Sequence, residues 1–177
     1  MSTLRVDAPI VMYVANDEYI FFCSHKEKYG FLSQWYESAF ILHGGEYHFA
    51  EQAMMAGKAK LFGDEETLKK IIAAADPRII KDLGRQVKGF VQQTWDLHKY
   101  NIVLENNRCK FGQNSELARK LLETGDKKLV EAADYDRVWG IGLSVVEAAA
   151  SLESEWLGEN LLGKILMQVR AELTSNV

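Results

Sequence analysis

The sequence predicts a single α+β domain over residues 1–177 that is predominantly α-helical, with a small β-sheet in its N-terminal third. Short runs of β-branched and aromatic residues are concentrated before residue 50, whereas apolar residues recur at helical spacing in most of the chain that follows. Only two prolines occur, Pro9 and Pro77, and no segment rich in Pro, Gly or Ser divides the chain. We therefore expect one domain with a sizeable core.

The predicted strands are short and are separated by turn residues. Residues 10–14 and 19–23 are β-branched and aromatic runs joined by Ala-Asn-Asp-Glu. Residues 40–42 and 46–49 flank a His-Gly-Gly turn, which predicts a β-hairpin because glycine tolerates a positive φ. Residues 128–132 form a further candidate strand.

The predicted helices begin at about residue 50. Residues 51–62 are rich in Ala, Met and Lys, and Gly63 then ends the helix. Asp64 is a candidate N-cap of the next helix, and Pro77 suits the first turn of a helix that runs toward residue 84. Further helices are expected over residues 89–108, from Asn114 or Ser115 to residue 125, and over residues 160–173.

Composition narrows the function. The formal net charge of −4 argues against strong non-specific binding to a nucleic-acid backbone, but it allows a small anionic ligand held by a few local cations. Cys23 and Cys109 have no metal-like spacing, which favours free thiols in a reducing compartment over a disulfide. The N-terminal apolar stretch is too short for a membrane helix and lacks a cleavable signal pattern, so we expect no membrane association and a cytoplasmic or nucleo-cytoplasmic location.

Several familiar kinds of site are missing from the sequence. The four histidines show no HxxxH spacing and the cysteines are not paired, so no metal site is expected. No GxSxG nucleophile elbow occurs. Gly140 and Gly142 form a GxG fragment without the third glycine of a dinucleotide-binding loop.

Glu51 and Lys58 are the first pair of interest. They lie seven residues apart, almost two helical turns, so both point to one face of the predicted helix with their backbones roughly 10 Å apart. That separation is too long for a simple salt bridge but would let both side chains converge on one sugar. Composition alone favours a solvated charged face instead.

Residues 134–142 are the second cluster of interest. Two acids, two aromatic residues and two glycines occur within these nine positions. Aromatic residues stack on planar rings and glycines let a backbone approach a ligand, so the pattern is typical of a binding loop. A structural turn around a buried Trp139 explains the composition equally well.

These segments belong to an ordered series of short motifs. The motifs occupy residues 29–33, 51–58, 83–85, 110–114, 122–126, 129–132, 136–142 and 156–163. Each is weak alone, but the series resembles the NADAR (YbiA-like) family over about residues 20–173. Members of that family are N-glycosidases: some hydrolyse phosphoribosyl-amino-pyrimidine intermediates of riboflavin synthesis, and others remove ADP-ribose from guanine bases. The resemblance implies the same class of enzyme, working without a cofactor or a metal.

The resemblance also implies which residues form the site. Catalytic roles fall to Glu51, Lys58 and Asp136. Substrate contacts are expected from Trp139, Gly140, Gly30, Phe31, Ser33, Arg85, Lys110 and Asn160. The sequence departs from the family pattern at Gln34, where Asn is usual, and at residues 52–53, where His and an aromatic residue are usual. The second departure removes one possible ring-stacking or hydrogen-bonding group.

Cleaving a ribosyl C–N bond requires stabilisation of an oxocarbenium-like C1′ and protonation of the leaving base. Glu51 would hold the ribose hydroxyls or move the proton. A desolvated Lys58 would attack C1′ as a free amine and give a ring-opened Schiff base, or else it would stay charged and bind a phosphate. Asp136 would orient the ribose or assist proton transfer, and Trp139 would stack on the base. Arg85 and Lys110 are candidate phosphate contacts.

We expect the substrate to be an ADP-ribosylated guanine base or nucleotide, in modified DNA or RNA or free, because the sequence contains no fused riboflavin-pathway enzyme. An adducted base in a duplex would be read unpaired or flipped out. Two alternatives remain at this point: hydrolysis of riboflavin-pathway intermediates, and a non-catalytic ADP-ribose-binding module. A helical interaction scaffold is disfavoured by the clustering of Trp139 with glycines and acids.

Overall fold

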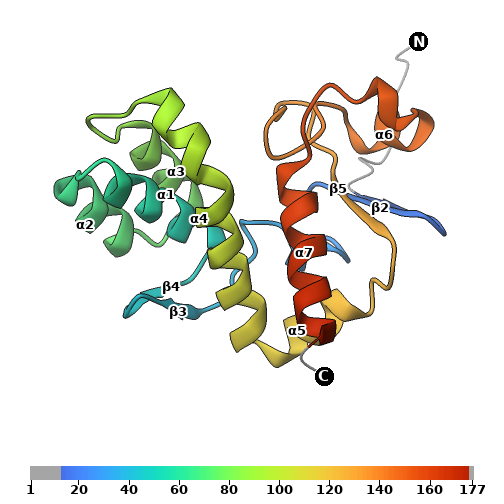
Figure 1. The fold of residues 1–177 in the computed structure, drawn as a ribbon, viewed down its shortest axis with the longest axis horizontal. Helices are drawn as coiled ribbons and strands as arrows, with labels where there is room; N and C mark the ends of the chain where they lie inside the picture. Colours follow the sequence, from blue (N-terminus) through green and yellow to red (C-terminus); the bar gives the residue numbers. More distant parts are fainter. Residues whose placement is uncertain (1–12, 176–177) are drawn as a thin grey trace, which may run out of the picture.

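The computed structural model describes residues 13–175, which form the predicted α+β fold (Figure 1). The described strands and helices are β1 (Tyr13–Ala15), β2 (Tyr19–Phe22), β3 (Phe40–Leu42), β4 (Gly45–Tyr47), α1 (Ala50–Leu61), α2 (Glu65–Ala73), α3 (Pro77–Arg85), α4 (Gln92–Gln113), α5 (Ser115–Leu122), β5 (Lys128–Glu131), α6 (Val145–Ala150) and α7 (Leu161–Ser175). Two short 3-10 turns cover Gly30–Leu32 and Glu153–Glu155. None of the helices in this part of the chain is long and apolar enough to cross a membrane.

Strand β2 occupies the centre of a three-stranded sheet. It pairs antiparallel with β1 and parallel with β5, so that Phe22 lies opposite Glu131. The predicted strand over residues 128–132 is therefore confirmed, and it extends the sheet beyond the N-terminal third. The predicted strand over residues 10–14 begins outside the described residues; Tyr13 and Val14 belong to β1.

Both faces of the sheet are covered, as expected for a parallel pair of strands. Ile20, Phe22 and Leu129 belong to the main core with residues of α1, α4 and α7. Phe21 and Val130, which point the opposite way, belong to a smaller core together with residues of α6. The sheet thus separates two apolar clusters.

The predicted hairpin is present as the separate two-stranded sheet β3–β4. His43 and Gly44 at its turn have φ values of 50° and 76°, a conformation that glycine adopts without strain. Strand β4 ends at Tyr47, two residues earlier than predicted, because Phe49 already serves as the extended N-cap residue of α1.

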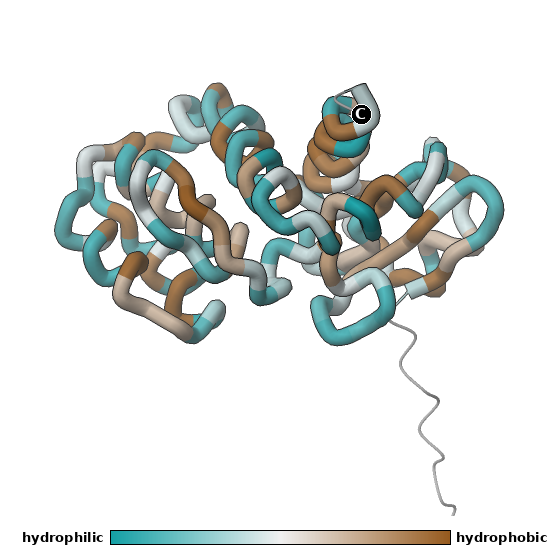
Figure 2. The backbone as a smooth tube through the Cα atoms, turned by 90° about the horizontal axis from the view of Figure 1, so that it is seen from below, coloured by the Kyte–Doolittle hydropathy of each residue, from teal (hydrophilic) through white to brown (hydrophobic). Residues whose placement is uncertain are grey.

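The helices form two groups. Helices α1, α2 and α3 pack together on one side of α4, and α7 packs on α4 and on β5 (Figure 1). Polar and apolar segments alternate along the helical tubes, as expected when one face of each helix lies in the core (Figure 2). The predicted caps are confirmed: the side chain of Asp64 accepts a hydrogen bond from the Thr67 amide at the start of α2, and Pro77 is the first residue of α3.

Two helices differ from the prediction. Helix α4 continues to Gln113, five residues past the predicted end, and Asn114 is its C-cap. Helix α6 was not predicted, although Ser144 and Glu147 form a complete capping box at its start. At six residues it is too short to show a clear apolar period.

Candidate active site

A cavity of about 710 Å³ lies between helices α1, α3 and α4 and the three-stranded sheet. Its walls come from α1, α3 and the start of α4 on one side, and from the segments that follow β2 and β5 on the other. Because β2 and β5 are parallel, their carboxyl ends meet at one edge, which brings Cys23, His25 and Glu131 together. The volume lies within the range of roughly 300–1,000 Å³ that is usual for small-molecule sites.

The cavity has a charge balance opposite to that of the whole chain. Five cationic side chains line it, against three carboxylic acids, whereas the chain as a whole has a formal charge of −4. The cations are Lys58, Lys81, Arg85, Lys99 and Arg137, and the acids are Glu51, Glu131 and Asp136. Aromatic walls are provided by Trp35, Phe90, Trp95, Tyr135 and Trp139. These groups suit a ligand with anionic parts and planar rings.

Glu51 lies in the first turn of α1 and is 5% exposed. Its backbone amide donates to the Gln34 carbonyl at 3.0 Å, but its carboxyl makes no hydrogen bond to another described residue. Burial raises the pKa of this carboxyl to about 7. The charge of Asp136 also raises it, while Lys81 and Arg85 act in the opposite direction. Glu51 can therefore hold or release a proton near neutral pH.

Glu131, the last residue of β5, is a site residue that the sequence analysis did not identify. The residue is partly exposed to the cavity, whereas its Oε2 atom is sealed from solvent and has no hydrogen-bond partner in the described part of the chain. Burial raises the pKa of Glu131 to about 8, and the charges of Asp136 and Glu51 add to the effect. Glu51, Glu131 and Asp136 form what we call the acid cluster.

Asp136 shapes the loop that carries it. Its Oδ1 accepts hydrogen bonds from the amides of Val138 at 2.9 Å and Trp139 at 2.8 Å, and its carbonyl oxygen accepts one from Gly142. These bonds fix the loop against the cavity. Asp136 and Trp139 both line the cavity as a result.

Lys58 lies near the other end of α1. Its Nζ donates to the Gly84 carbonyl at 2.8 Å and lies 4.2 Å from the Phe90 ring centroid and 5.8 Å from that of Trp95. Burial lowers the pKa of this amine, and no carboxylate of the acid cluster counteracts the effect. We call Lys58, Gly84, Phe90 and Trp95 the lysine corner.

A second lysine, Lys81, lies at an aromatic wall of the cavity. Lys81 Nζ lies 5.6 Å from the Trp35 ring centroid and 5.9 Å from that of Tyr135. The two rings therefore face a common space that now holds a cation. Arg85 is exposed and pairs with Asp82 at 3.1 Å, an interaction that a ligand phosphate can replace at little cost because both partners are solvated.

The structure brings six of the predicted site residues together around the cavity: Glu51, Lys58, Asp136, Trp139, Ser33 and Arg85. The other five, Gly30, Phe31, Gly140, Lys110 and Asn160, do not line it. These five residues pack against, or hydrogen-bond to, the backbone segments that carry the cavity residues.

Lys110 is placed beneath the cavity and not in it. The side chain is fully buried, and its Nζ donates to the Ser33 carbonyl at 2.8 Å. Burial lowers its pKa to about 7. Phe31 belongs to the main core, and Gly30 lies so close to His25 that an added Cβ would approach the His25 carbonyl oxygen to 2.2 Å.

Asn160 and Gly140 hold β5 from behind. Asn160 Oδ1 accepts from the Glu131 amide at 3.1 Å, and its Nδ2 donates to the Leu129 carbonyl at 3.0 Å. A Cβ on Gly140 would come within 2.7 Å of the Glu131 carbonyl oxygen, so only glycine lets this loop pack on the strand end. Both residues therefore position Glu131.

The two departures from the family pattern have different locations. Gln34 lines the cavity and exchanges two side-chain hydrogen bonds with Asn107. Gln52 is 1% exposed and turns away from the cavity: it accepts from the His48 amide and donates to carbonyls at the end of α2. The Gln52 amide therefore ties α1 to α2. That the change from the family pattern at residues 52–53 removes a ring-stacking or hydrogen-bonding group stays a prediction.

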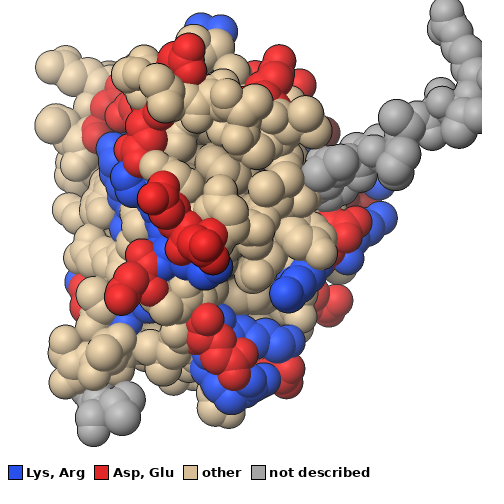
Figure 3. Space-filling view, turned by 90° about the vertical axis from the view of Figure 1, so that its right-hand side faces the viewer, with Lys and Arg blue, Asp and Glu red and all other residues tan. Residues whose placement is uncertain are grey.

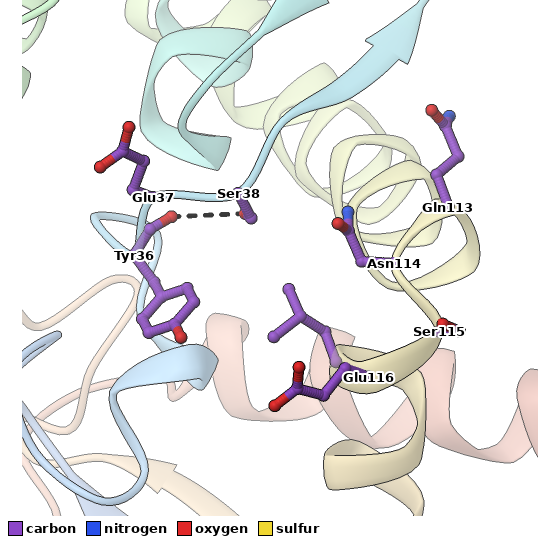
Figure 4. Close-up of a pocket in the computed structure, with 8 residues that line it drawn as sticks. Tyr36, Glu37, Ser38, Gln113, Asn114, Ser115 and Glu116 are labelled. Atoms are coloured by element: carbon purple, nitrogen blue, oxygen red, sulfur yellow. Dashed lines mark hydrogen bonds between the residues drawn. The ribbon is translucent and has the colours of Figure 1, made fainter.

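A smaller hollow of about 360 Å³ lies beside the start of α5 (Figure 4). Tyr36, Glu37 and Ser38 face Asn114 and Glu116 across it, and its one drawn hydrogen bond joins Ser38 to the Tyr36 carbonyl. Neither acid among these lining residues is buried, and no lining residue is a cation. The larger cavity is therefore the candidate site.

On the face shown in Figure 3, acids and bases are interspersed around an uncharged centre.

Known proteins resemble this chain over almost its whole length. The model of the NADAR domain matches residues 21–174. An N-glycosidase of Acanthamoeba polyphaga mimivirus is 48% identical over 164 residues, which cover 88% of this chain and 96% of the relative. A riboflavin biosynthesis protein of Vibrio vulnificus is 31% identical over 87% of this chain, but the match covers only 38% of that protein. The solution structure of Escherichia coli YbiA superposes with a TM-score of 0.76 at 28% identity, covering 94% of this chain and 90% of YbiA.

Proposed function

The chain belongs to the NADAR family, and on that premise we propose that it is an N-glycosidase that hydrolyses the bond between a ribose C1′ and a base nitrogen. The observation that carries the proposal is the combination of two buried carboxyls of raised pKa with five cations and five aromatic side chains around one cavity. A ribosyl–base bond needs proton transfer at the base, anion binding at the phosphates and stacking of a planar ring.

Glu51 and Asp136 act on the ribose in this proposal. The uncoordinated Glu51 carboxyl has a pKa near neutrality, which suits a group that exchanges a proton with water or a ribose hydroxyl. Two amide hydrogen bonds hold the Asp136 carboxylate in place, and its negative charge favours the oxocarbenium-like C1′.

Lys58 supplies the nucleophile. Its amine is partly desolvated, its one hydrogen-bond partner among residues 13–175 is the neutral Gly84 carbonyl, and its lowered pKa increases the fraction of free amine. Attack of Nζ on C1′ expels the base and opens the ring to a Schiff base, which water hydrolyses to the free sugar. The alternative role is anion binding, which the nearby Phe90 ring also favours because it stabilises a cation.

The proposed substrate is guanine that carries ADP-ribose, in a nucleotide or in DNA or RNA. This adduct has two planar base systems and a diphosphate, which fits five aromatic walls and five cations better than a ligand with one ring and one phosphate. The formal net charge of −4 fits recognition of a single modified base better than tracking of a nucleic-acid backbone.

A phosphoribosyl-amino-pyrimidine is the second candidate substrate, and the name of the Vibrio vulnificus relative favours it. A non-catalytic ADP-ribose-binding module is a weaker third possibility, because a binding protein gains nothing from carboxyls whose burial raises their pKa to about 7 and about 8.

The proposal is tested by mass spectrometry of two reactions under the same conditions. The chain is incubated with ADP-ribosylated guanosine and, separately, with the phosphoribosyl-amino-pyrimidine. We expect release of free ADP-ribose from the first, and its loss in Glu51→Ala and Lys58→Ala. Hydrolysis of the pyrimidine alone would assign the chain to riboflavin metabolism, and binding without either reaction would leave a binding module.

The Schiff base has its own test. Reduction of the enzyme–substrate mixture with borohydride fixes an imine as a stable amine. We expect a covalent adduct on the peptide that contains Lys58, and none in Lys58→Arg. Full turnover without an adduct would assign Lys58 to anion binding.

A further inference from the structure

We propose that Glu131 is a further catalytic residue of this site, and that its protonated carboxyl donates the proton that the leaving base needs. The inference rests on the proposed N-glycosidase function and adds a role that neither the motifs nor the matched relatives' names assign. Its starting point is the position of Glu131 at the carboxyl end of β5, in the wall of the cavity.

The backbone of Glu131 is held on both sides. Asn160 Oδ1 accepts from its amide at 3.1 Å, and its carbonyl accepts from the Ile141 amide at 3.0 Å. Pairing with β2 places it beside Phe22. A side chain on such a rigid strand end is well placed for directed proton transfer, because little ordering is needed on substrate binding.

The side chain has no structural partner that would explain its burial. Oε2 is sealed from solvent and accepts no hydrogen bond from the described residues. An unsatisfied buried oxygen costs about 1–3 kcal/mol, so it is retained only where the surroundings or a function compensate. Because Glu131 is partly exposed and lines the cavity, its protonated carboxyl can offer a bound ligand a donor.

The surroundings of Glu131 favour the neutral acid. The carboxylate of Asp136 is held in place by the amides of Val138 and Trp139, and its negative charge opposes ionisation of Glu131. Cys23 and Tyr135 also interact with Glu131, and burial raises the pKa of both, so they remain uncharged at neutral pH. Lys81 is the one cation that acts on Glu131, and its effect is smaller than those of burial and the two acids.

Glu51 and Glu131 thereby receive different roles. Asp136 raises the pKa of both carboxyls and Lys81 lowers both, but Arg85 lowers only that of Glu51, and Glu51 adds to the rise at Glu131. A single proton shared by the pair therefore resides mainly on Glu131, which is the acid, and Glu51 is the base.

The proton balance closes within this pair. As the C1′–N bond breaks, its electron pair stays on the base nitrogen, which takes the proton of Glu131. The water that completes hydrolysis gives its hydroxyl to C1′ and its proton to Glu51. Transfer of that proton from Glu51 to Glu131 restores the starting state. The donor role is the same whether Lys58 or water attacks C1′ first.

The test compares Glu131→Gln with Glu131→Asp, using the exposed Glu46→Gln on β4 as the matched control. Gln keeps the size and can donate a hydrogen bond, but it cannot release a proton. We expect Glu131→Gln to lower kcat by about 10²–10⁴-fold with KM changed by less than about threefold, the usual effect of losing a general acid. Glu131→Asp should keep part of the rate, and Glu46→Gln all of it.

The pH profile separates chemistry from folding. The unmodified chain should lose kcat/KM as pH rises through the region of pH 8, where Glu131 ionises. Glu131→Asp should retain such an alkaline limb, and the residual activity of Glu131→Gln should not. An unchanged rate and limb in Glu131→Gln would overturn the inference, as would equal losses in Gln and Asp variants that both unfold at lower temperature. No turnover of either proposed substrate by the unmodified chain would instead overturn the proposed function, and the inference with it.

Discussion

The two ends of helix α1 face the same cavity with opposite chemistry. At its start, Glu51 is 5% exposed and interacts electrostatically with Asp136, Lys81 and Arg85. Two turns later, the half-buried Lys58 lies among Gly84, Phe90 and Trp95, and burial alone shifts its pKa. The acid cluster is thus a coupled group suited to moving protons, whereas the lysine corner is an isolated amine suited to attack or anion binding.

Removing the proton exchange at the acid cluster should have the largest effect. Glu51→Gln preserves the shape of the side chain but abolishes its acid–base function, so kcat should fall by about 10³-fold, within the usual range for such groups. KM should change little because the cations and aromatic walls remain. Steady-state kinetics on ADP-ribosylated guanosine measure both constants, with Glu46→Gln as the control for the same chemical change. Activity within threefold of the unmodified chain would remove Glu51 from the mechanism.

The lysine corner should respond in a way that identifies its role. Lys58→Met should lower kcat/KM by about 10²-fold or more, since either a nucleophile or a phosphate partner is lost. Lys58→Arg keeps the positive charge but cannot form a Schiff base. Compared with Lys58→Met, we expect Lys58→Arg to recover the KM of the unmodified chain but not its kcat. Recovery of kcat by arginine would contradict the nucleophile and make both ends of α1 binding elements. Lys69→Met, on the exposed face of α2, is the matched control.

The aromatic wall beside the acid cluster should affect binding more than turnover. Base–aromatic stacking is worth about 1–3 kcal/mol, so Trp139→Ala should raise KM by roughly 5–150-fold with a smaller change in kcat. The measurement is the same steady-state assay, accompanied by a thermal unfolding curve because Trp139 also packs on the main core. A fall in kcat alone would indicate that Trp139 positions Asp136 rather than the base.

The acid cluster should also be visible in the stability of the protein without any substrate. Glu131 has a pKa of about 8 in the fold against 4.5 as the ordinary value, so its contribution is fully present below pH 4.5 and is lost as pH rises to 8. Glutamine does not ionise, and Glu131→Gln should therefore be more stable than the unmodified chain well above pH 8, by up to about 5 kcal/mol, and equal to it below pH 4.5. Urea unfolding at both pH values measures the difference. A destabilised variant at both would show that the carboxyl serves the fold.

The predictability of the two regions from sequence differs for a physical reason. The face shared by Glu51 and Lys58 depends only on helical spacing, which is local, and the structure places both residues at the cavity. Glu131 lies in one of the short motifs, residues 129–132, but it reaches the same cavity only through the parallel pairing of β2 with β5, which joins distant segments. Sequence spacing alone therefore could not identify the third member of the acid cluster.

The same distinction explains which predicted contacts do not reach the cavity. Lys110 and Asn160 have side chains typical of ligand contacts, but packing of α4 and α7 buries both beneath the site, where they bind backbone carbonyls. Their residue types indicate polar contacts near the site, but the sequence does not show that both side chains are buried beneath the cavity. Helix α6 is the opposite case, since its Ser144–Glu147 capping box was present in the sequence as a local signal and was overlooked.

The most direct test of the account is to identify the bond that breaks. The chain is incubated with ADP-ribosylated guanosine in water enriched in oxygen-18, quenched early, and the products are weighed by mass spectrometry. We expect unlabelled guanosine and intact ADP-ribose with one heavy oxygen in its ribose, as hydrolysis at C1′ requires. AMP with a labelled phosphate would show cleavage of the diphosphate instead, and unchanged substrate at full binding would show that the cavity only recognises it; either result would contradict the account.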